Sequence, residues 1–139
     1  MKFLSYFFFY TYIGLVLLAG FWGAFLFPSM DFPYLMEMDL TSLPARTKAN
    51  LLSQYRFLRA LELGFGLFSI IFLKEIFRER RFNLLFLGIM GSGVLARLVS
   101  WWVDGIPNPL FFFFLAYEAV GWMIILVYSR KIGIYDVKP

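Results

Sequence analysis

Four long apolar stretches dominate this chain of 139 residues and leave few folds open to it. A helix needs about 20 mostly apolar residues to cross a hydrocarbon core of roughly 30 Å. We predict such helices over four ranges, which are 3–27, 50–73, 84–103 and 110–128. Only 16% of the residues are charged, whereas soluble domains are about a quarter charged. The sequence therefore predicts an all-α polytopic membrane protein, with residues 1–139 forming a single domain, a bundle of four transmembrane helices.

The basic residues predict how this bundle is oriented. Lysine and arginine concentrate in the segment 74–83, and Arg130 and Lys131 follow the last apolar stretch. Because cytoplasmic loops carry an excess of lysine and arginine, we place this segment and both chain termini on the cytoplasmic side. The predicted topology is N-in and C-in, with residues 29–48 and 104–109 outside.

The two outer segments differ in their sequence. Residues 104–109 contain a glycine and two prolines and predict a short turn. Residues 29–48 combine Pro33 and Pro44 with many apolar side chains. The prolines argue against one continuous helix, and the apolar residues indicate a segment that lies at the interface or covers the bundle.

Small residues recur at helical spacing in the third apolar stretch. Gly88, Ser92, Ala96 and Ser100 follow one another every four residues. Such a stripe lets two membrane helices approach closely, and we expect it to pack either inside the bundle or in a homo-oligomer. In the first stretch we expect Gly20 and Ala24 to form a similar pair.

Several functions are disfavoured by the composition. The chain has neither cysteine nor histidine, which removes thiol chemistry, imidazole acid–base catalysis and the common zinc ligands. The net charge of +4 comes from residues beside apolar stretches rather than from a basic groove with stacking side chains. We predict no metal, no cofactor and no nucleic-acid partner.

Charged residues inside the apolar stretches are the strongest functional signal. At 1.5 Å per residue, Arg59 lies roughly 14 Å from the outer start of its helix, and Glu118 about 14 Å beyond Pro109. Arg97 lies roughly 10 Å in from Asp104. Because isolated charges at such depth are costly, we predict that Arg97 pairs with Glu118.

The same reasoning predicts a wider polar site. Arg59 is expected to pair with Glu62 or Glu118, while Ser100 and Asp104 share the helical face of Arg97 and continue the network outward. The predicted ligand-binding residues are Arg59, Arg97, Ser100, Asp104 and Glu118. The alternative is that these pairs only fix which helices meet. Tyr55 and Arg56 are interpreted as interfacial residues without a role in the site.

The segment Ala-Arg-Leu-Val-Ser-Trp-Trp-Val-Asp-Gly-Ile-Pro at 96–107, followed by Glu118, resembles the signature of a known family. It is an uncharacterised family, labelled as a domain of unknown function, of small bacterial four-helix membrane proteins near the DoxX-like group. Arg59 with Gly64 and Gly66 is similar too, whereas Ala96 stands where that family often has glycine. The resemblance implies the four-helix fold and a bacterial cytoplasmic (inner) membrane location, and it supplies no reaction.

Three functions remain open at this stage. The first is a non-catalytic module that binds a lipid, a quinone-like amphiphile or a partner membrane protein through the charged cluster. The second is a membrane-embedded enzyme of an isomerase type, in which Glu118, Asp104 or Glu62 moves protons on a lipid substrate. The third is a proton-coupled transporter that works as an oligomer, although no inverted repeat is visible. The absence of a strong nucleophile favours the first.

Overall fold

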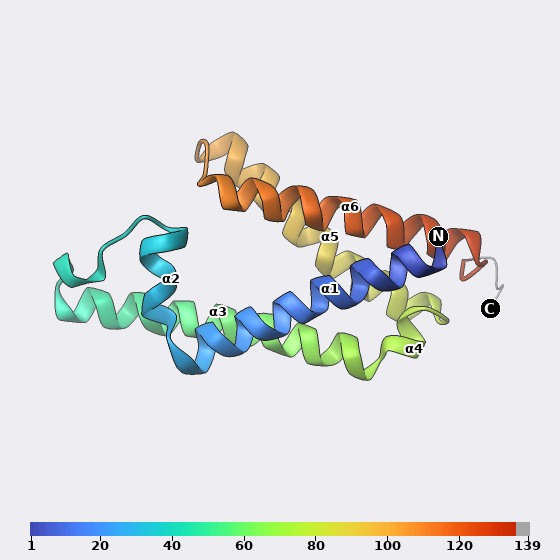
Figure 1. Cartoon of the computed structure of the whole chain (residues 1–139), viewed down its shortest axis with the longest axis horizontal. Coiled ribbons are helices and arrows are strands. Elements are labelled where there is room, and N and C mark those ends of the chain that lie inside the picture. The colour runs from blue at the N-terminus through green and yellow to red at the C-terminus, as the bar shows by residue number, and fades with distance from the viewer. Residues whose placement is uncertain (136–139) are drawn as a thin grey trace. The chain divides into compact units, whose positions relative to one another are not determined.

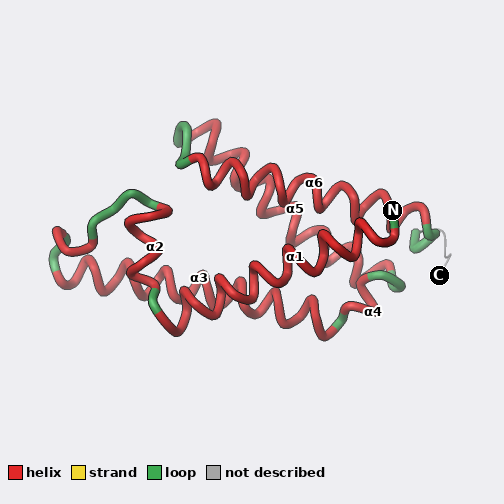
Figure 2. Tube along the Cα trace, in the orientation of Figure 1, coloured by secondary structure: helices red, strands yellow, loops and turns green. Residues whose placement is uncertain are grey.

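The computed structural model describes residues 1–135, which are helical almost throughout (Figure 1 and Figure 2). In chain order the elements are α1 (Lys2–Phe21), a π-helical turn (Trp22–Leu26), α2 (Pro28–Leu35), a 3-10 turn (Leu40–Ser42), α3 (Ala45–Ile71), α4 (Leu73–Ile76), α5 (Arg80–Val103) and α6 (Pro109–Lys131). No strand occurs in residues 1–135. The predicted all-α fold class is confirmed.

Three of the helical segments are long and apolar enough to cross a membrane. They are Lys2–Leu26, Arg80–Val103 and Pro109–Lys131, and they match three of the four predicted ranges. The helix α3 has the length for a crossing, but every 18-residue stretch of it contains Arg56, Arg59 and Glu62. By length and composition, three helices thus qualify as membrane-crossing, and α3 does not qualify because of its charges.

The turn between α5 and α6 has the chemistry that its sequence predicts. Gly105 adopts a φ of 105° just beyond the end of α5, a conformation that glycine accepts without steric cost. Asn108 then caps α6, because its side-chain oxygen accepts a hydrogen bond of 2.9 Å from the amide of Leu110. Pro109 occupies the first helical position, where its missing N–H costs nothing.

The chain divides into two compact units, residues 1–12 with 69–139 and residues 13–68. In the first unit, α5 and α6 run antiparallel on either side of their short turn (Figure 1). Its core is aromatic and aliphatic and includes the fully buried Phe9, Phe86 and Ile125. The first turns of α1 join this core, where the ring of Tyr6 stacks on that of Phe77 at 4.4 Å.

Glycines other than those of the predicted stripe bring α5 and α6 together. A Cβ atom on Gly91 would lie 2.9 Å from Nε1 of Trp122, and this indole nitrogen donates a hydrogen bond of 2.8 Å to the carbonyl of Leu87. By contrast, Gly88 has nothing within 4 Å of its Cβ position. Ser92, Ala96 and Ser100 are likewise exposed. Within the described residues the stripe is therefore exposed and does not support the alternative that it packs inside the bundle, while packing in a homo-oligomer stays a prediction.

In the second unit, α2 and the 3-10 turn fold back onto the beginning of α3. Phe32 and Leu40 are buried against Tyr55, with Leu51 and Leu52 around them. The predicted loop 29–48 is therefore largely helical, because Pro28 occupies the first position of α2 and favours a helix start. These residues pack on α3 within this unit, while a position at the interface or over the bundle stays a prediction.

Gly20 marks a close crossing between α1 and α3 in this second unit. Its Cβ position lies only 2.7 Å from the backbone nitrogen of Leu63. Further along, the guanidinium of Arg56 donates a hydrogen bond of 2.6 Å to the carbonyl of Ala24. Gly20 and Ala24, which were predicted as a close-packing pair, thus both contact α3. At Gly20 the absence of a side chain lets the two helix backbones approach closely.

Candidate functional site

Arg97 and Glu118 form an ion pair between α5 and α6. The Nε atom of Arg97 donates to Oε2 of Glu118 at 3.0 Å, and Nη2 lies 3.4 Å from Oε1. The pair is bidentate, a geometry in which the planar guanidinium matches the carboxylate. The predicted pairing of these two residues is confirmed.

The two partners differ in how far they are buried. The side chain of Glu118 is 14% exposed, whereas that of Arg97 is 34% exposed. Neither bond to Glu118 uses the Nη1 nitrogen of Arg97. A guanidinium carries five N–H donors, so Arg97 has donor capacity beyond its pair with Glu118.

Aromatic rings flank this ion pair on the side of the turn at 104–108. The guanidinium carbon of Arg97 lies 5.7 Å from the ring centroid of Phe111, which is seven residues before Glu118 on α6. One turn beyond Arg97, Trp101 meets Phe112 edge to face at 5.0 Å. The polar pair is therefore bordered by apolar aromatic surface.

Ser100 and Asp104 do not extend the network, contrary to our expectation. Both are exposed, and neither side chain forms a hydrogen bond or ion pair with another residue in the range 1–135. Asp104 is the C-terminal cap of α5, where its amide donates to the carbonyl of Ser100 at 2.7 Å.

A second charged cluster surrounds Arg59 within the other unit. Its Nη1 donates to Oε2 of Glu62 at 2.6 Å, and its Nε and Nη2 donate to the hydroxyl of Tyr55 at 2.8 and 2.6 Å. Nη2 also lies 3.9 Å from Oδ2 of Asp31. The predicted pairing with Glu62 is confirmed, while Glu118 belongs to the first unit and pairs there with Arg97.

Tyr55 and Asp31 are members of this cluster that the sequence reasoning missed. The Tyr55 hydroxyl donates to Oδ2 of Asp31 at 2.6 Å, and Tyr55 is only 7% exposed. Tyr55 therefore belongs to this polar cluster, contrary to the interpretation that it has no role in the site. The signal was present in the spacing, because Tyr55, Arg59 and Glu62 share one helical face. Asp31 was not foreseeable without the fold of α2.

We expect Tyr55→Phe to lower the free energy of unfolding by about 2 kcal/mol, because hydrogen bonds to charged groups contribute about 1.5–3 kcal/mol. The variant removes one hydroxyl that serves both Asp31 and Arg59. Tyr34→Phe is the matched control, since Tyr34 is 71% exposed. Unfolding in mixed detergent micelles gives both values, and equal stabilities of the two variants would contradict a structural role for the Tyr55 hydroxyl.

Gly23 makes room for the side chain of Arg59. A Cβ atom at this position would lie 2.5 Å from Cγ of Arg59 and 2.9 Å from its Cδ. The π-helical turn Trp22–Leu26 carries Gly23, so an irregular part of the first helical segment receives the arginine. The Arg59 cluster is thus closely packed as well as hydrogen-bonded.

The two clusters differ in how their arginine is surrounded. Arg59 has three polar partners and a side chain that is only 16% exposed. Arg97 has one carboxylate partner, an aromatic neighbour and twice the exposure. No group of three acidic, histidine or cysteine residues within the described range is placed to hold a metal ion.

The fold and these clusters define an all-α protein with three potential membrane-crossing helices and two separate arginine–carboxylate centres. Comparison with known families then gives a more specific assignment. The chain belongs to the family described as "Domain of unknown function (DUF4345)", whose model matches residues 1–129. No curated protein and no solved structure matches the chain significantly. The family assignment confirms the resemblance to an uncharacterised family, while the relation to the DoxX-like group and a bacterial source stay predictions.

Proposed function

We propose that this chain is an integral membrane protein with four crossings that binds the polar head of an amphiphile beside Arg97 without converting it chemically. The four-helix domain, the cytoplasmic location of both termini and the bacterial inner membrane are parts of this proposal. The proposal has one alternative, in which Arg97 binds another membrane protein or a second copy of the chain.

The fourth crossing in this proposal is α3. Its apolar half, from Leu63 to Ile71, carries no charge. Its polar half places Arg59 against Tyr55, Asp31 and Glu62, which lowers the cost of taking this arginine into an apolar environment. Four crossings also put the basic segment 74–83 and both termini on one side, in agreement with the positive-inside rule.

The exposure of Arg97 is the observation that carries the proposed binding role. A partly exposed guanidinium in an otherwise apolar helix meets lipid or the interior of the membrane domain, where an unused N–H donor is costly. A carbonyl or anionic head group satisfies such a donor. Glu118 holds the guanidinium plane in place, and Phe111 and Trp101 supply apolar surface for the rest of the molecule.

The geometry gives less support to the enzymatic alternative. An acid–base isomerase requires carboxylates that face a common substrate. Glu118 is bound by Arg97, Glu62 is bound by Arg59 within the other unit, and Asp104 is exposed with no ion pair in residues 1–135. A proton-coupled transporter stays an alternative as well, and loss of proton flux in proteoliposomes of Arg97→Ala is the result that would favour it.

We expect the wild-type protein, purified in mild detergent, to retain one amphiphile that native mass spectrometry and organic extraction identify. Glu118→Gln is expected to lower its occupancy about tenfold, because the amide no longer orients Arg97 and a charge-assisted bond is lost. Glu62→Gln makes the same chemical change in the other ion pair. This control should retain the ligand.

Two results would contradict the proposal. The wild-type protein could carry only lipids in the proportions in which the membrane contains them. That result would show that there is no selective site at Arg97. Equal losses in Glu118→Gln and Glu62→Gln would show that the ligand responds to general destabilisation of the fold. Either result would leave the two ion pairs with a structural role only.

A further inference from the structure

A buried polar cluster fixes the place where α5 begins and α6 ends. Asn83 and Ser129 are fully buried, and the Asn83 amide donates at 2.8 Å both to the carbonyl of Ile76 and to Oγ of Ser129. The hydroxyl of Tyr135 donates to Oδ1 of the same asparagine. This cluster holds Tyr135, which follows the end of α6, against the start of α5.

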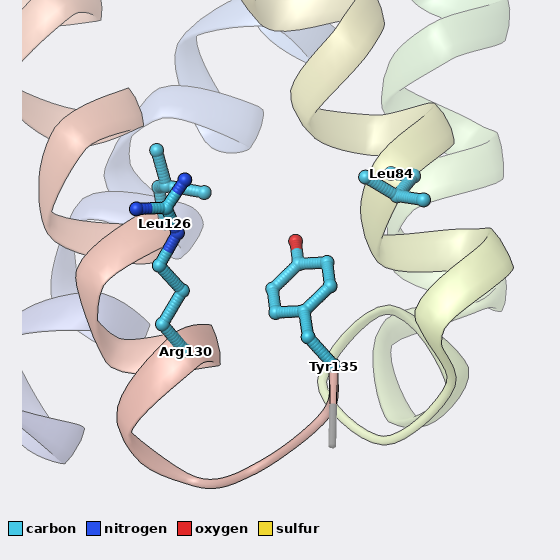
Figure 3. A pocket seen from close by; sticks show the side chains of 4 residues that line it. All are labelled: Leu84, Leu126, Arg130 and Tyr135. Atoms are coloured by element: carbon cyan, nitrogen blue, oxygen red, sulfur yellow. The ribbon is translucent and has the colours of Figure 1, made fainter. Parts of the chain in front are cut away.

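The ring of Tyr135 forms one wall of a cavity at this junction. The cavity has a volume of about 440 Å³ and is lined by Leu84, Leu126, Arg130 and Tyr135. Figure 3 shows Leu84 of α5 on one side of the tyrosine ring and Leu126 with Arg130 of α6 on the other. Polar and apolar groups thus converge on one space that the described part of the chain leaves empty.

Two arginines stand at the same end of this junction. Arg80 precedes Leu84 by four residues on α5, and Arg130 follows Leu126 by four residues on α6. Residues four apart lie on one face of a helix. On each helix the arginine therefore lies on the same face as the leucine, one turn nearer the helix terminus at this junction. Both arginines are exposed, and neither forms an ion pair with any residue in the range 1–135.

Tyr135 does not neutralise these arginines. Burial raises the pKa of its hydroxyl, against the opposing effect of Arg130 and Arg80. The hydroxyl therefore stays protonated at neutral pH and donates a hydrogen bond to Oδ1 of Asn83. Arg130 lines the cavity, and Arg80 is close enough to Tyr135 to act on its pKa. Neither arginine forms an ion pair among the described residues.

We propose that this cavity binds an anionic phospholipid, with its phosphate between Arg80 and Arg130 and the start of one acyl chain along Leu84 and Leu126. Guanidinium groups bind phosphate through paired, charge-assisted hydrogen bonds. The leucines lie one turn deeper in the apolar helices than the arginines, which is the order of hydrocarbon and phosphate in a lipid. Basic pockets between membrane helices commonly receive such head groups.

This lipid site is separate from the amphiphile site at Arg97. Arg97 is seventeen positions after Arg80 on α5, which corresponds to about 25 Å along a helix. The two sites are therefore at opposite ends of α5, and the lipid proposal does not depend on the function proposed above.

The test uses the full chain in detergent, titrated with phosphatidylglycerol and followed by native mass spectrometry. We expect Arg80→Gln/Arg130→Gln to weaken phosphatidylglycerol binding at least about tenfold, because two charge-assisted contacts are lost. The control Arg78→Gln/Arg81→Gln removes two positive charges from the same basic segment without touching the cavity lining. It should weaken binding less than about twofold, since exposed charges at a distance are screened by salt.

Further measurements separate a lipid site from a site for any phosphate. Leu84→Ala/Leu126→Ala should weaken phosphatidylglycerol binding. Arg80→Lys/Arg130→Lys keeps both charges and should therefore weaken the binding less than Arg80→Gln/Arg130→Gln. Inorganic phosphate alone should not displace the lipid at millimolar concentration. Displacement by inorganic phosphate, or equal losses in the two double glutamine variants, would overturn the proposal.

Discussion

Arg97→Leu is expected to lower the free energy of unfolding by about 3–5 kcal/mol, because it leaves Glu118 as an unpaired and largely buried carboxylate. The side chain of Glu118 is only 14% exposed in the paired state. The reverse variant, Glu118→Leu, should cost less, because the 34% exposed side chain of Arg97 is less desolvated than the 14% exposed side chain of Glu118. Equilibrium unfolding in mixed detergent micelles measures both values.

The double variant Arg97→Leu/Glu118→Leu provides the control for this asymmetry. It removes both charges and should recover most of the loss, because a buried ion pair rarely contributes more than apolar packing of similar volume. If the double variant is as unstable as the sum of the two single variants, Arg97 and Glu118 do not interact energetically. Leu98 is a neighbour of Arg97 and is 42% exposed. A cycle that combines Arg97→Leu with Leu98→Ala should show additive effects on the free energy of unfolding.

The ion pairs were predictable because each depends on local geometry. Arg97 and Glu118 lie on adjacent helices joined by a short turn, so counting residues from the turn places them nearly level. Arg59 and Glu62 are three residues apart on one helix and meet without any tertiary information. In both cases the free-energy cost of an unpaired charge in an apolar segment indicated that the arginine would have a carboxylate partner.

The rest of the Arg59 cluster depends on chain reversal, which the sequence pattern does not encode. Asp31 reaches Tyr55 only because α2 folds back onto α3, with Phe32 packed against the tyrosine ring at 5.0 Å. The prolines of residues 29–48 suggested a loop, whereas Pro28 starts a helix and Pro33 is tolerated within it. A proline thus marks a boundary without saying on which side of it the helix lies.

Periodicity has limits at two further places. Asp104 has the helical spacing of Arg97, and its amide still donates to the carbonyl of Ser100, but its side chain is exposed and Arg97 pairs with Glu118. The stripe that begins at Gly88 has the spacing of a packing surface, yet α5 meets α6 through Gly91. Spacing identifies which residues share a face of a helix, and the neighbouring helix decides which face is used.

Gly20→Ala is expected to lower the free energy of unfolding by about 3 kcal/mol, at the upper end of the usual cost of overpacking. The new methyl group would lie 2.7 Å from the backbone nitrogen of Leu63 and 3.0 Å from the carbonyl oxygen of Arg59. Backbone atoms within a helix cannot turn aside as a flexible side chain does. The crossing of α1 and α3 must therefore widen, and this moves Gly23 away from the side chain of Arg59 that it accommodates.

The matched control for this change is Gly14→Ala in the same helix, because Gly14 has nothing within 4 Å of its Cβ position. Alanine is a better helix former than glycine by about 1 kcal/mol, so this variant should be neutral or slightly stabilising. The two substitutions add the same methyl group and differ only in the atoms that surround it. Measuring the free energy of unfolding of both variants in the same micelles therefore isolates the effect of the contact with α3. Equal stabilities of the two variants would show that α1 and α3 do not approach closely at Gly20, and the support that this crossing gives to the Arg59 cluster would be lost with it.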